Sequence, residues 1–590
     1  MPTSLPDIAL HGLLMEAGEL VRNKRALEAV KLLRARNKAV IAEPYGCFVF
    51  ALAHEALGEH TKALQFYDLL FKSVPDHPDA LLNAANIHRS LFDLDRALAL
   101  AARAIAAHPN DARAYICQAR ILSAQRHHEE ALAAIDQAIA IKPDALTLTM
   151  RGSCLIELGR LAEGLEAQNE AARREPANVS VQTVALFGAN YDESLSAADL
   201  FSRYVAFAQR FETPLLKERK PWRNTREPQR RLKIGYLSPD FRGHVVGKFI
   251  EPVLAQHDRR NFHITCLSTE AITDAATKRM QRHVDQWRFL RPSDELAADG
   301  IRHDQIDILV DLAGHTTGSR LMIFARKPAP IQATWLGTGY TTGLTSIDYF
   351  LGSKQQTPPG CEAYFSEKPI HLPVIVPLAE PRPTPDVSPL PALLNGYVSF
   401  GCLSRIIRLN EGVIDVWAKI LNALPTSRLI LDQLNFEEAA TVTNFLALFA
   451  KHGISADRLV LRNSKPFWNS YHDIDIALDP FPHNAGTTTY DALWMGVPVV
   501  SMRDRPPLGR FGDAILTPAG LADWVTDTRE DYIARAVAAA RDLDALQGLR
   551  TGMRARLRSS PLMDVAGFTR ALEAAYRAMW TDWCARKAES

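Results

Sequence analysis

The amino-acid sequence predicts an α-solenoid at the N-terminal end, followed by an α/β region built from two halves with parallel sheets. Two patterns predict this fold class: a repeat of about 34 residues near the N-terminus, and apolar strands that alternate with amphipathic helices after residue 231. Length agrees, because 590 residues are too many for one hydrophobic core and about three domains are expected.

The solenoid is predicted from a series of prolines. Pro75, Pro109, Pro143 and Pro176 are spaced by 34, 34 and 33 residues, and small residues recur at fixed positions before each of them. Two helices per period, with small residues where they cross and a proline after the second, are typical of tetratricopeptide repeats. We assign the repeats to residues 1–180 and expect their concave face to bind a protein. An oligomerisation arm or a spacer is the alternative.

A helical linker is expected over residues 181–230, where helical patterning persists without the period. Its basic stretch KERKPWRNTREPQRR (217–231) is interpreted as a solvated domain boundary. The net charge of +1 provides no basic field, so no nucleic-acid partner is expected.

The composition indicates a soluble cytoplasmic protein. The seven cysteines are dispersed and form no CxxC pair, which argues against a disulfide framework and against a zinc site. The N-terminus lacks the pattern of a signal peptide, and no apolar run approaches the ~20 residues that span a bilayer. We therefore expect no metal, no membrane insertion and a reducing compartment.

The α/β region is predicted as two lobes, residues 231–390 and 391–590. In the first, the strands are LKIGYLS, HITCLS, DILVDLAG and IQATWLG; in the second, they are YVSFGCL, SRLILDQL, RLVLRN, DIDIALD and PVVSM, with a long helix from Asn435 between two of them. This alternation predicts parallel sheets covered by helices on both faces. Ligands bind beyond the carboxyl ends of such strands, so the cleft between the lobes is the expected site.

The most informative segment is LDPFPHNAGTTTYDALWMGVPVV (478–500). A strand leads into a turn that ends at Gly486; three threonines, beginning with Thr487 and Thr488, then open a helix, and Asp491 is expected in its first turn. Unpaired N–H groups, hydroxyls and the positive end of the helix dipole would form a cradle for a phosphate, and the acid could hold a ribose hydroxyl. The segment suggests a nucleotide-sugar site. An ordinary junction capped by Thr and Asp side chains is the alternative.

A basic loop, FGCLSRIIRLN (400–410), follows the first strand of the second lobe. Arg405 and Arg408 could reach a phosphate opposite the threonine helix, where a cation would stabilise a departing nucleotide. A surface arginine on a capped helix is the alternative.

A histidine lies at the corresponding place in the first lobe, in LSPDFRGHVVGKF (237–249). His244 could take a proton from an acceptor hydroxyl or hydrogen-bond to it. The alternative is a capping or structural histidine, and Asp240 is interpreted as a turn or capping residue.

Two further loops of the first lobe end strands with glycines and hydroxyls. His315 and Thr316 lie in DLAGHTTGSR (311–320), and Gly337 and Thr341 lie in PAPIQATWLGTGYTTG (328–343). They could line the acceptor or sugar side, because glycines let a backbone approach a ligand. Tight turns with capping threonines are the alternative.

Together these motifs resemble a known family. Repeats followed by SPDFxxH, DLxGHT, RxPAPIQxxWLG, DIALDPFPxNxxTTTxDALWMGVPVV and SSPL…LEAAYRAMW are similar to the protein O-GlcNAc transferases, whose relatives include the plant SPINDLY O-fucosyltransferases. The resemblance implies two Rossmann-like lobes in the GT-B arrangement, a donor held mainly by the second lobe, no metal or other cofactor, and inverting transfer to Ser or Thr of a protein.

By the same resemblance, His244 lies near the reaction centre, Thr487 and Thr488 hold the donor phosphate, and Asp491 holds the nucleoside. Arg510, in GRFGDAIL, matches an arginine of the family that is expected to be structural.

The chain also departs from the family. The phosphate-binding lysine of the family's FNNxxK motif is Arg408 here, and the asparagines are Ser404 and Arg405. An arginine keeps the charge but is not interchangeable with an ammonium. The segment that shapes the base pocket, usually close to REEHLALY, is KPFWNSYH (465–472).

These departures leave the donor and the acceptor open. UDP-GlcNAc is the default donor; the alternative is a flagellin glycosyltransferase that uses a CMP-activated nonulosonic acid. A non-catalytic repeat scaffold is the alternative from a different class. The repeats are expected to bind the protein acceptor, and a homodimer formed through their exposed faces is not excluded.

Overall fold

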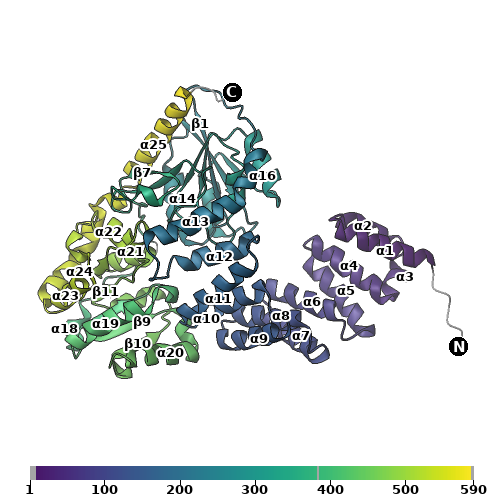
Figure 1. The fold of residues 1–590 in the computed structure, drawn as a ribbon, viewed down its shortest axis with the longest axis horizontal. Helices are drawn as coiled ribbons and strands as arrows, with labels where there is room; N and C mark the ends of the chain where they lie inside the picture. The colour runs from purple at the N-terminus through teal and green to yellow at the C-terminus, as the bar shows by residue number, and fades with distance from the viewer. Residues whose placement is uncertain (1–7, 382–383, 587–590) are drawn as a thin grey trace. The chain divides into compact units, whose positions relative to one another are not determined.

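The structure, a computed structural model, describes residues 8–381 and 384–586 and divides after Leu158 into two compact units. The first unit is helical and the second contains both parallel sheets (Figure 1).

The first unit is a series of paired helices. Small residues are fully buried where the two helices of a pair cross, among them Ala63, Ala97 and Ala131. The turn between the helices of a pair carries a left-handed residue at Lys24, Gly58, Phe92 and Arg126, again 34 residues apart. The helices are α1 (Ile8–Arg22), α2 (Ala26–Arg34), α3 (Asn37–Ala42), α4 (Pro44–Ala56), α5 (His60–Ser73), α6 (Pro78–Ser90), α7 (Leu94–Ala107), α8 (Ala112–Ala124), α9 (His128–Ile141) and α10 (Ala145–Glu157).

The second unit starts with three helices: α11 (Leu161–Arg174), α12 (Val179–Ala189) and α13 (Ala197–Phe211). After α12, Glu193 accepts a hydrogen bond from the backbone N–H of Gly412 in the second lobe. After α13, Glu212 accepts one from the backbone N–H of Ser346 in the first lobe at 2.7 Å. The predicted linker is therefore packed against the lobes that it precedes.

The first lobe contains a seven-stranded parallel sheet in the order β3-β2-β1-β4-β5-β6-β7. The strands are β1 (Leu232–Ser238), β2 (Phe262–Ser268), β3 (Gln286–Phe289), β4 (Ile308–Asp311), β5 (Ile331–Thr334), β6 (Tyr349–Ser353) and β7 (Lys368–Leu372). The helices are α14 (Val245–Gln256), α15 (Ala275–Gln281), α16 (Asp294–His303) and α17 (Leu321–Ala325).

The second lobe contains a six-stranded parallel sheet in the order β10-β9-β8-β11-β12-β13. The strands are β8 (Ser399–Cys402), β9 (Arg428–Asp432), β10 (Leu459–Arg462), β11 (Ile476–Leu478), β12 (Val499–Met502) and β13 (Val525–Thr526). The helices are α18 (Pro391–Asn395), α19 (Glu411–Ala423), α20 (Ala439–Ala450), α21 (Thr487–Trp494), α22 (Phe511–Leu516), α23 (Arg529–Ala540) and α24 (Leu543–Arg558).

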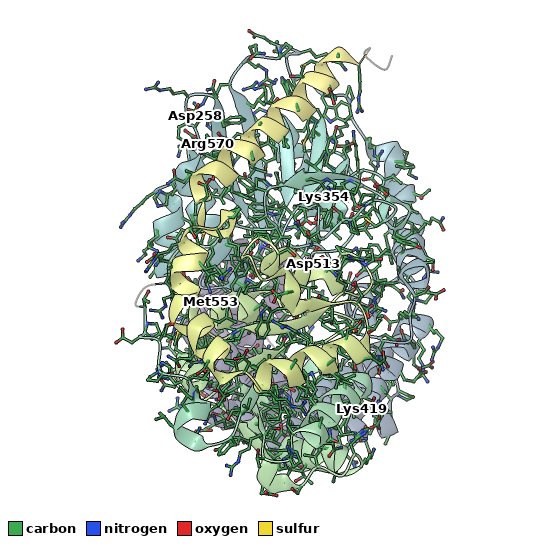
Figure 2. All side chains as sticks on the ribbon, turned by 90° about the vertical axis from the view of Figure 1, so that its left-hand side faces the viewer. Asp258, Lys354, Lys419, Asp513, Met553 and Arg570 are labelled. Carbon is green, nitrogen blue, oxygen red and sulfur yellow. The ribbon has the colours of Figure 1, made fainter. Side chains whose placement is uncertain are left out.

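The last helix, α25 (Val565–Ala585), returns to the first lobe and packs on α14, β5 and β7. Its Glu573 accepts a hydrogen bond from the backbone N–H of Asp258, and the hydroxyl groups of Tyr576 and Tyr236 lie 3.1 Å apart. Figure 2 shows this helix beside the strands of the first lobe, near the labelled Asp258. A closing C-terminal helix therefore joins the two ends of the second unit.

The two parallel sheets and the helical repeats confirm the predicted fold class. The long helix expected from Asn435 begins later, at Ala439, after a short 3-10 turn. Strands β3, β6, β7 and β13 were not expected. Three of these are edge strands; β3 is half exposed, β7 contains a proline, and β13 has two residues, so their apolar patterns are weak.

Candidate functional site

Helix α21 starts without a side-chain cap. β11 leads into the turn before it, where the Asp479 carboxylate accepts a hydrogen bond from the backbone N–H of Ala485 at 2.7 Å. The helix begins at Thr487, and a Cβ atom at Gly486 would meet open space. Among the described residues, none accepts a hydrogen bond from the N–H groups of residues 486–488 or bonds the hydroxyls of residues 487 and 488. The capped-junction alternative is therefore not what the structure shows, and the helix start is free to bind an anion.

Two arginines lie near this helix start, on the short turn that follows β8. The Arg408 Nε donates to Nδ1 of His483 at 3.0 Å, and its guanidinium lies 5.7 Å from the ring centre of Tyr191. Arg405 lies 6.0 Å from the ring centre of Phe187. Within the described part of the chain, neither forms a salt bridge. Burial lowers the pKa of the Arg408 guanidinium, and the nearby Tyr191 hydroxyl and Asp479 carboxyl partly oppose this effect.

His483 joins the second lobe to the helices that precede the lobes. Its ring packs edge-on against Tyr191 at 4.7 Å and against Phe511 at 5.8 Å. Burial and the charge of Arg408 hold the pKa of His483 well below its usual range, so the imidazole is neutral and its Nδ1 accepts a hydrogen bond from the Arg408 Nε–H. This histidine orients the guanidinium.

An ion pair connects the two lobes beside the helix start. Lys248 Nζ, from α14, lies 2.9 Å from Oδ1 of Asp491 in α21. Asp491 was expected in the first turn of α21. It is the fifth helical residue and lies one turn after Thr487, because the helix begins at Thr487 and one turn takes about 3.6 residues. The rings of Phe249 and Tyr490 form a second contact at 5.7 Å. Burial raises the pKa of the Asp491 carboxyl, and Lys248 opposes this effect.

His244 is the N-cap of α14, the helix that carries Lys248. Its Nδ1 accepts a hydrogen bond from the backbone N–H of Val246 at 3.3 Å and lies 3.5 Å from the Asp240 carboxylate. Burial lowers the pKa of His244 in spite of that carboxylate, so the imidazole is neutral near pH 7. Because Nδ1 accepts, Nε2 carries the proton and can donate it. The residue therefore caps the helix, yet its side chain is 42% exposed.

His244 and Lys248 are four residues apart and lie on one face of α14. Since Lys248 meets α21, His244 is placed about one helical turn from that contact. The first lobe thus brings an imidazole toward α21 of the second lobe.

Three of the four residues expected on the acceptor side form hydrogen bonds within the first lobe, and the fourth, Gly337, lies close to a neighbouring backbone. His315 is buried; its Nε2 lies 2.8 Å from the Thr342 carbonyl oxygen, and burial lowers its pKa to about 4. The Thr316 hydroxyl donates to the Ala313 carbonyl, and Thr341 donates to Glu367. A Cβ atom at Gly337 would meet the Ala313 backbone at 2.4 Å. The tight-turn alternative describes these loops, and a role toward the acceptor stays a prediction.

Several residues of this region were not found from the sequence. Tyr191 belongs to the linker, and its place beside Arg408 depends on the folded chain. Arg510, which the resemblance did single out, has a buried Nε without a partner among the described residues, and its structural role stays a prediction. Lys248 could have been found, because it follows His244 by one helical turn.

No three His, Cys, Asp or Glu side chains in residues 8–381 and 384–586 are grouped to hold a metal ion. In the same ranges no helix has the length and apolar character needed to cross a membrane.

Comparison with known proteins gives relatives for both units. The model of glycosyl transferase family 41 matches residues 214–378 and 392–572, and a tetratricopeptide repeat model matches residues 48–112 and 116–179. The chain is 36% identical over 410 residues to a Petunia hybrida protein named "Probable UDP-N-acetylglucosamine--peptide N-acetylglucosaminyltransferase SPINDLY". It is 29% identical over 378 residues to the Arabidopsis thaliana relative whose name ends in SEC.

These alignments cover 68% and 60% of this chain but 44% and 38% of the relatives, so the chain spans less than half of the length of these curated proteins. A solved structure of a Thermobaculum terrenum O-GlcNAc transferase mutant matches with a TM-score of 0.80 at 33% identity, and it covers 86% of this chain and 98% of that one. Since the family model spans more than half of the sequence and the fold agrees, the chain belongs to glycosyl transferase family 41, with helical repeats followed by two lobes of the GT-B type.

Proposed function

We propose that this protein is an inverting O-glycosyltransferase that moves a sugar from a nucleotide donor to a Ser or Thr hydroxyl of a protein. The observation that carries the proposal is the uncapped start of α21, next to arginines that have no carboxylate partner among the described residues. An anion at that place would satisfy the open N–H groups and balance the buried guanidinium at once.

In the proposed mechanism the acceptor hydroxyl attacks the anomeric carbon from the side opposite the departing nucleotide. The bond from that carbon to the phosphate oxygen breaks, and the hydroxyl proton passes to the leaving phosphate or to water. The leaving phosphate is held by the N–H groups and hydroxyls of Thr487 and Thr488 and by Arg408. One good donor to a developing negative charge stabilises a transition state by about 3 kcal/mol. The positive charge comes from the protein, and the proposed transfer needs no metal ion.

His244 is proposed to orient the acceptor. Its neutral imidazole has the proton on Nε2, so it can donate a hydrogen bond to an acceptor or sugar oxygen. In this tautomer Nε2 cannot take a proton, which supports orientation over deprotonation as its role.

UDP-GlcNAc is the proposed donor, since the names of the curated relatives contain it. The alternative is a CMP-activated nonulosonic acid, with flagellin as the acceptor. Its supporting observation is the exposed Arg405, which forms no salt bridge within the described residues and could bind a carboxylate on the sugar. The base-side segment also differs from the family, and Phe467 there is 46% exposed.

The repeats are proposed to bind the acceptor protein, because stacked helical repeats present surfaces for extended peptides. We place the reaction in the cytoplasm. The seven cysteines are unpaired, which suits a reducing compartment.

The test is sugar transfer followed by intact mass. The full chain is incubated with UDP-GlcNAc or with a CMP-activated nonulosonic acid, together with candidate acceptors that include flagellin. The expected result is a mass gain of one or more sugar units with one donor and no gain with the Arg408→Ala variant. Nucleotide binding without a mass gain from any donor would favour a non-catalytic scaffold.

A further inference from the structure

We propose that Lys248 is a donor-binding residue, which neutralises Asp491 and contacts the donor phosphate at the start of α21. This inference rests on the proposed function, because it assigns a further residue to the same site. Lys248 lies in the first lobe and would supply an ammonium group to the site. In the family that the sequence resembles, a lysine binds the phosphate at the position that Arg408 occupies here.

The first argument is position. Lys248 Nζ lies 2.9 Å from Asp491, and Asp491 follows Thr487 by four residues in α21. Side chains at this spacing lie about 5–6 Å apart on one face of a helix. A small rotation about the terminal bonds of the lysine would therefore place its ammonium group between Asp491 and an anion held at the helix start. Lys248 is 35% exposed and Asp491 only 6%, so the lysine is the partner that faces the open side.

The second argument is charge. The Asp491 carboxylate is buried, and Lys248 is the only cation that pairs with it in the described part of the protein. A phosphate at the helix start would place a second negative charge about one helical turn away, in surroundings that screen poorly. Without Lys248 the two anions would repel each other. With it, one ammonium group attracts both.

The third argument is the availability of its hydrogen bonds. An ammonium group has three donors, and Lys248 uses one of them on Asp491 Oδ1. The pair therefore does not have to break when a phosphate arrives. This separates the proposal from a latch, in which Lys248 would block Asp491 until the donor displaced it.

The experiment is calorimetry on the full chain with UDP, GDP and CMP, and with the nucleoside of whichever nucleotide binds. Lys248→Met should weaken nucleotide binding about tenfold or more, the size of one charge-assisted hydrogen bond, and leave nucleoside binding unchanged. In an Asp491→Asn background the same substitution should reduce nucleotide affinity by a smaller factor, because the carboxylate that repels the phosphate is gone.

The matched control is Lys419→Met. Like Lys248, Lys419 pairs with a carboxylate, but the partner belongs to its own lobe: its ammonium group lies 2.7 Å from Asp415. Lys419 lies on α19, on the outside of the molecule (Figure 2). This variant should bind every ligand as the wild type does. If Lys248→Met does not fold, Lys248→Gln replaces it, and Lys248→Arg should keep most of the affinity.

Wild-type or tighter nucleotide binding in the Lys248→Met variant would overturn the inference, and tighter binding would identify a latch. Equal losses for nucleotide and nucleoside would also overturn it, because they would indicate a structural role. If the wild-type protein binds none of the three nucleotides, the proposed function fails first and the inference falls with it.

Discussion

At the scale of single residues, the candidate site contains two arginines that form no salt bridge among the described residues. Arg408 is held by its bond to His483 and lies against the ring of Tyr191. The sequence proposed Arg408 and the threonines as candidates, because they follow strands at the carboxyl edge of the sheet. It could not identify His483 as the group that orients Arg408, since that contact joins residues 75 positions apart.

Replacing Arg408 separates charge from geometry. Arg408→Ala should lower turnover about 100-fold or more, because one donor to the leaving phosphate is lost. Arg408→Lys keeps the charge but loses the bond from Nε to His483, so its turnover should lie between those of the alanine variant and the wild type. The measurement is initial rate, with the melting temperature as the control for folding. An alanine variant that turns over like the wild type would remove Arg408 from the mechanism.

The pH dependence tests the role of His244. Burial places the pKa of His244 below the usual value of about 6.5, so the neutral form dominates above that value. Protonation would end the acceptor bond at Nδ1 and add a charge, so kcat/KM should fall as the pH decreases through this lowered pKa and stay level above it.

A second group titrates nearby, since burial raises the pKa of Asp479 to about 7. The His244→Asn variant, measured in single turnovers, distinguishes the two groups. In this variant the fall in rate at low pH that is due to His244 should vanish, and any fall that is due to Asp479 should remain. An acid limb that is unchanged in His244→Asn would refute the assignment.

At the scale of elements, the important feature is a helix that starts with free donors. The sequence predicted α21 and its strand, because an apolar run followed by Pro, Asn and Gly marks the turn. Whether the threonines cap the helix or leave it open could not be predicted, since both outcomes use the same residues. The structure shows the open form: the hydroxyl of Thr489 bonds the Ala485 carbonyl, and the two before it bond nothing among the described residues.

Three matched substitutions in one helix follow from this difference. Thr487→Val and Thr488→Val keep the shape and remove a free hydroxyl, so each should weaken nucleotide binding about tenfold with an unchanged melting temperature. Thr489→Val removes a hydroxyl that bonds the backbone, so it should lower the melting temperature and leave the affinity unchanged. Calorimetry and thermal unfolding measure both quantities. Equal effects from all three substitutions would contradict a phosphate site at the first two threonines.

At the scale of the whole molecule, the two compact units suggest a division of labour. The residues of the candidate donor site lie in residues 159–590, and so do the bonds from Glu193 and Glu212 to the two lobes. The 34-residue period allowed the repeats to be predicted, and the alternation of strands and helices allowed the lobes to be predicted. The packing of residues 181–230 against both lobes could not be foreseen, because buried carboxylates such as Glu212 find their partners only in the folded chain.

Removal of residues 1–158 should therefore separate binding of the donor from modification of a protein. The shortened chain should bind nucleotide with unchanged affinity, because the site is intact. It should transfer sugar to the protein acceptor poorly, because the proposed acceptor-binding repeats are missing. Nucleotide titration and intact mass of the acceptor measure the two effects. Undiminished modification of the acceptor would show that the repeats serve another purpose.

The central claim concerns where the donor phosphate binds. The most direct measurement is a crystal structure of the full chain with bound nucleotide, either UDP or CMP. The account predicts phosphate oxygens about 2.7–3.2 Å from the N–H groups and hydroxyls of Thr487 and Thr488, with the Arg408 guanidinium on the opposite side. A nucleotide that binds elsewhere, for example in the pocket lined by Glu411, Asp415 and His452 on the outside of the second lobe, would contradict it.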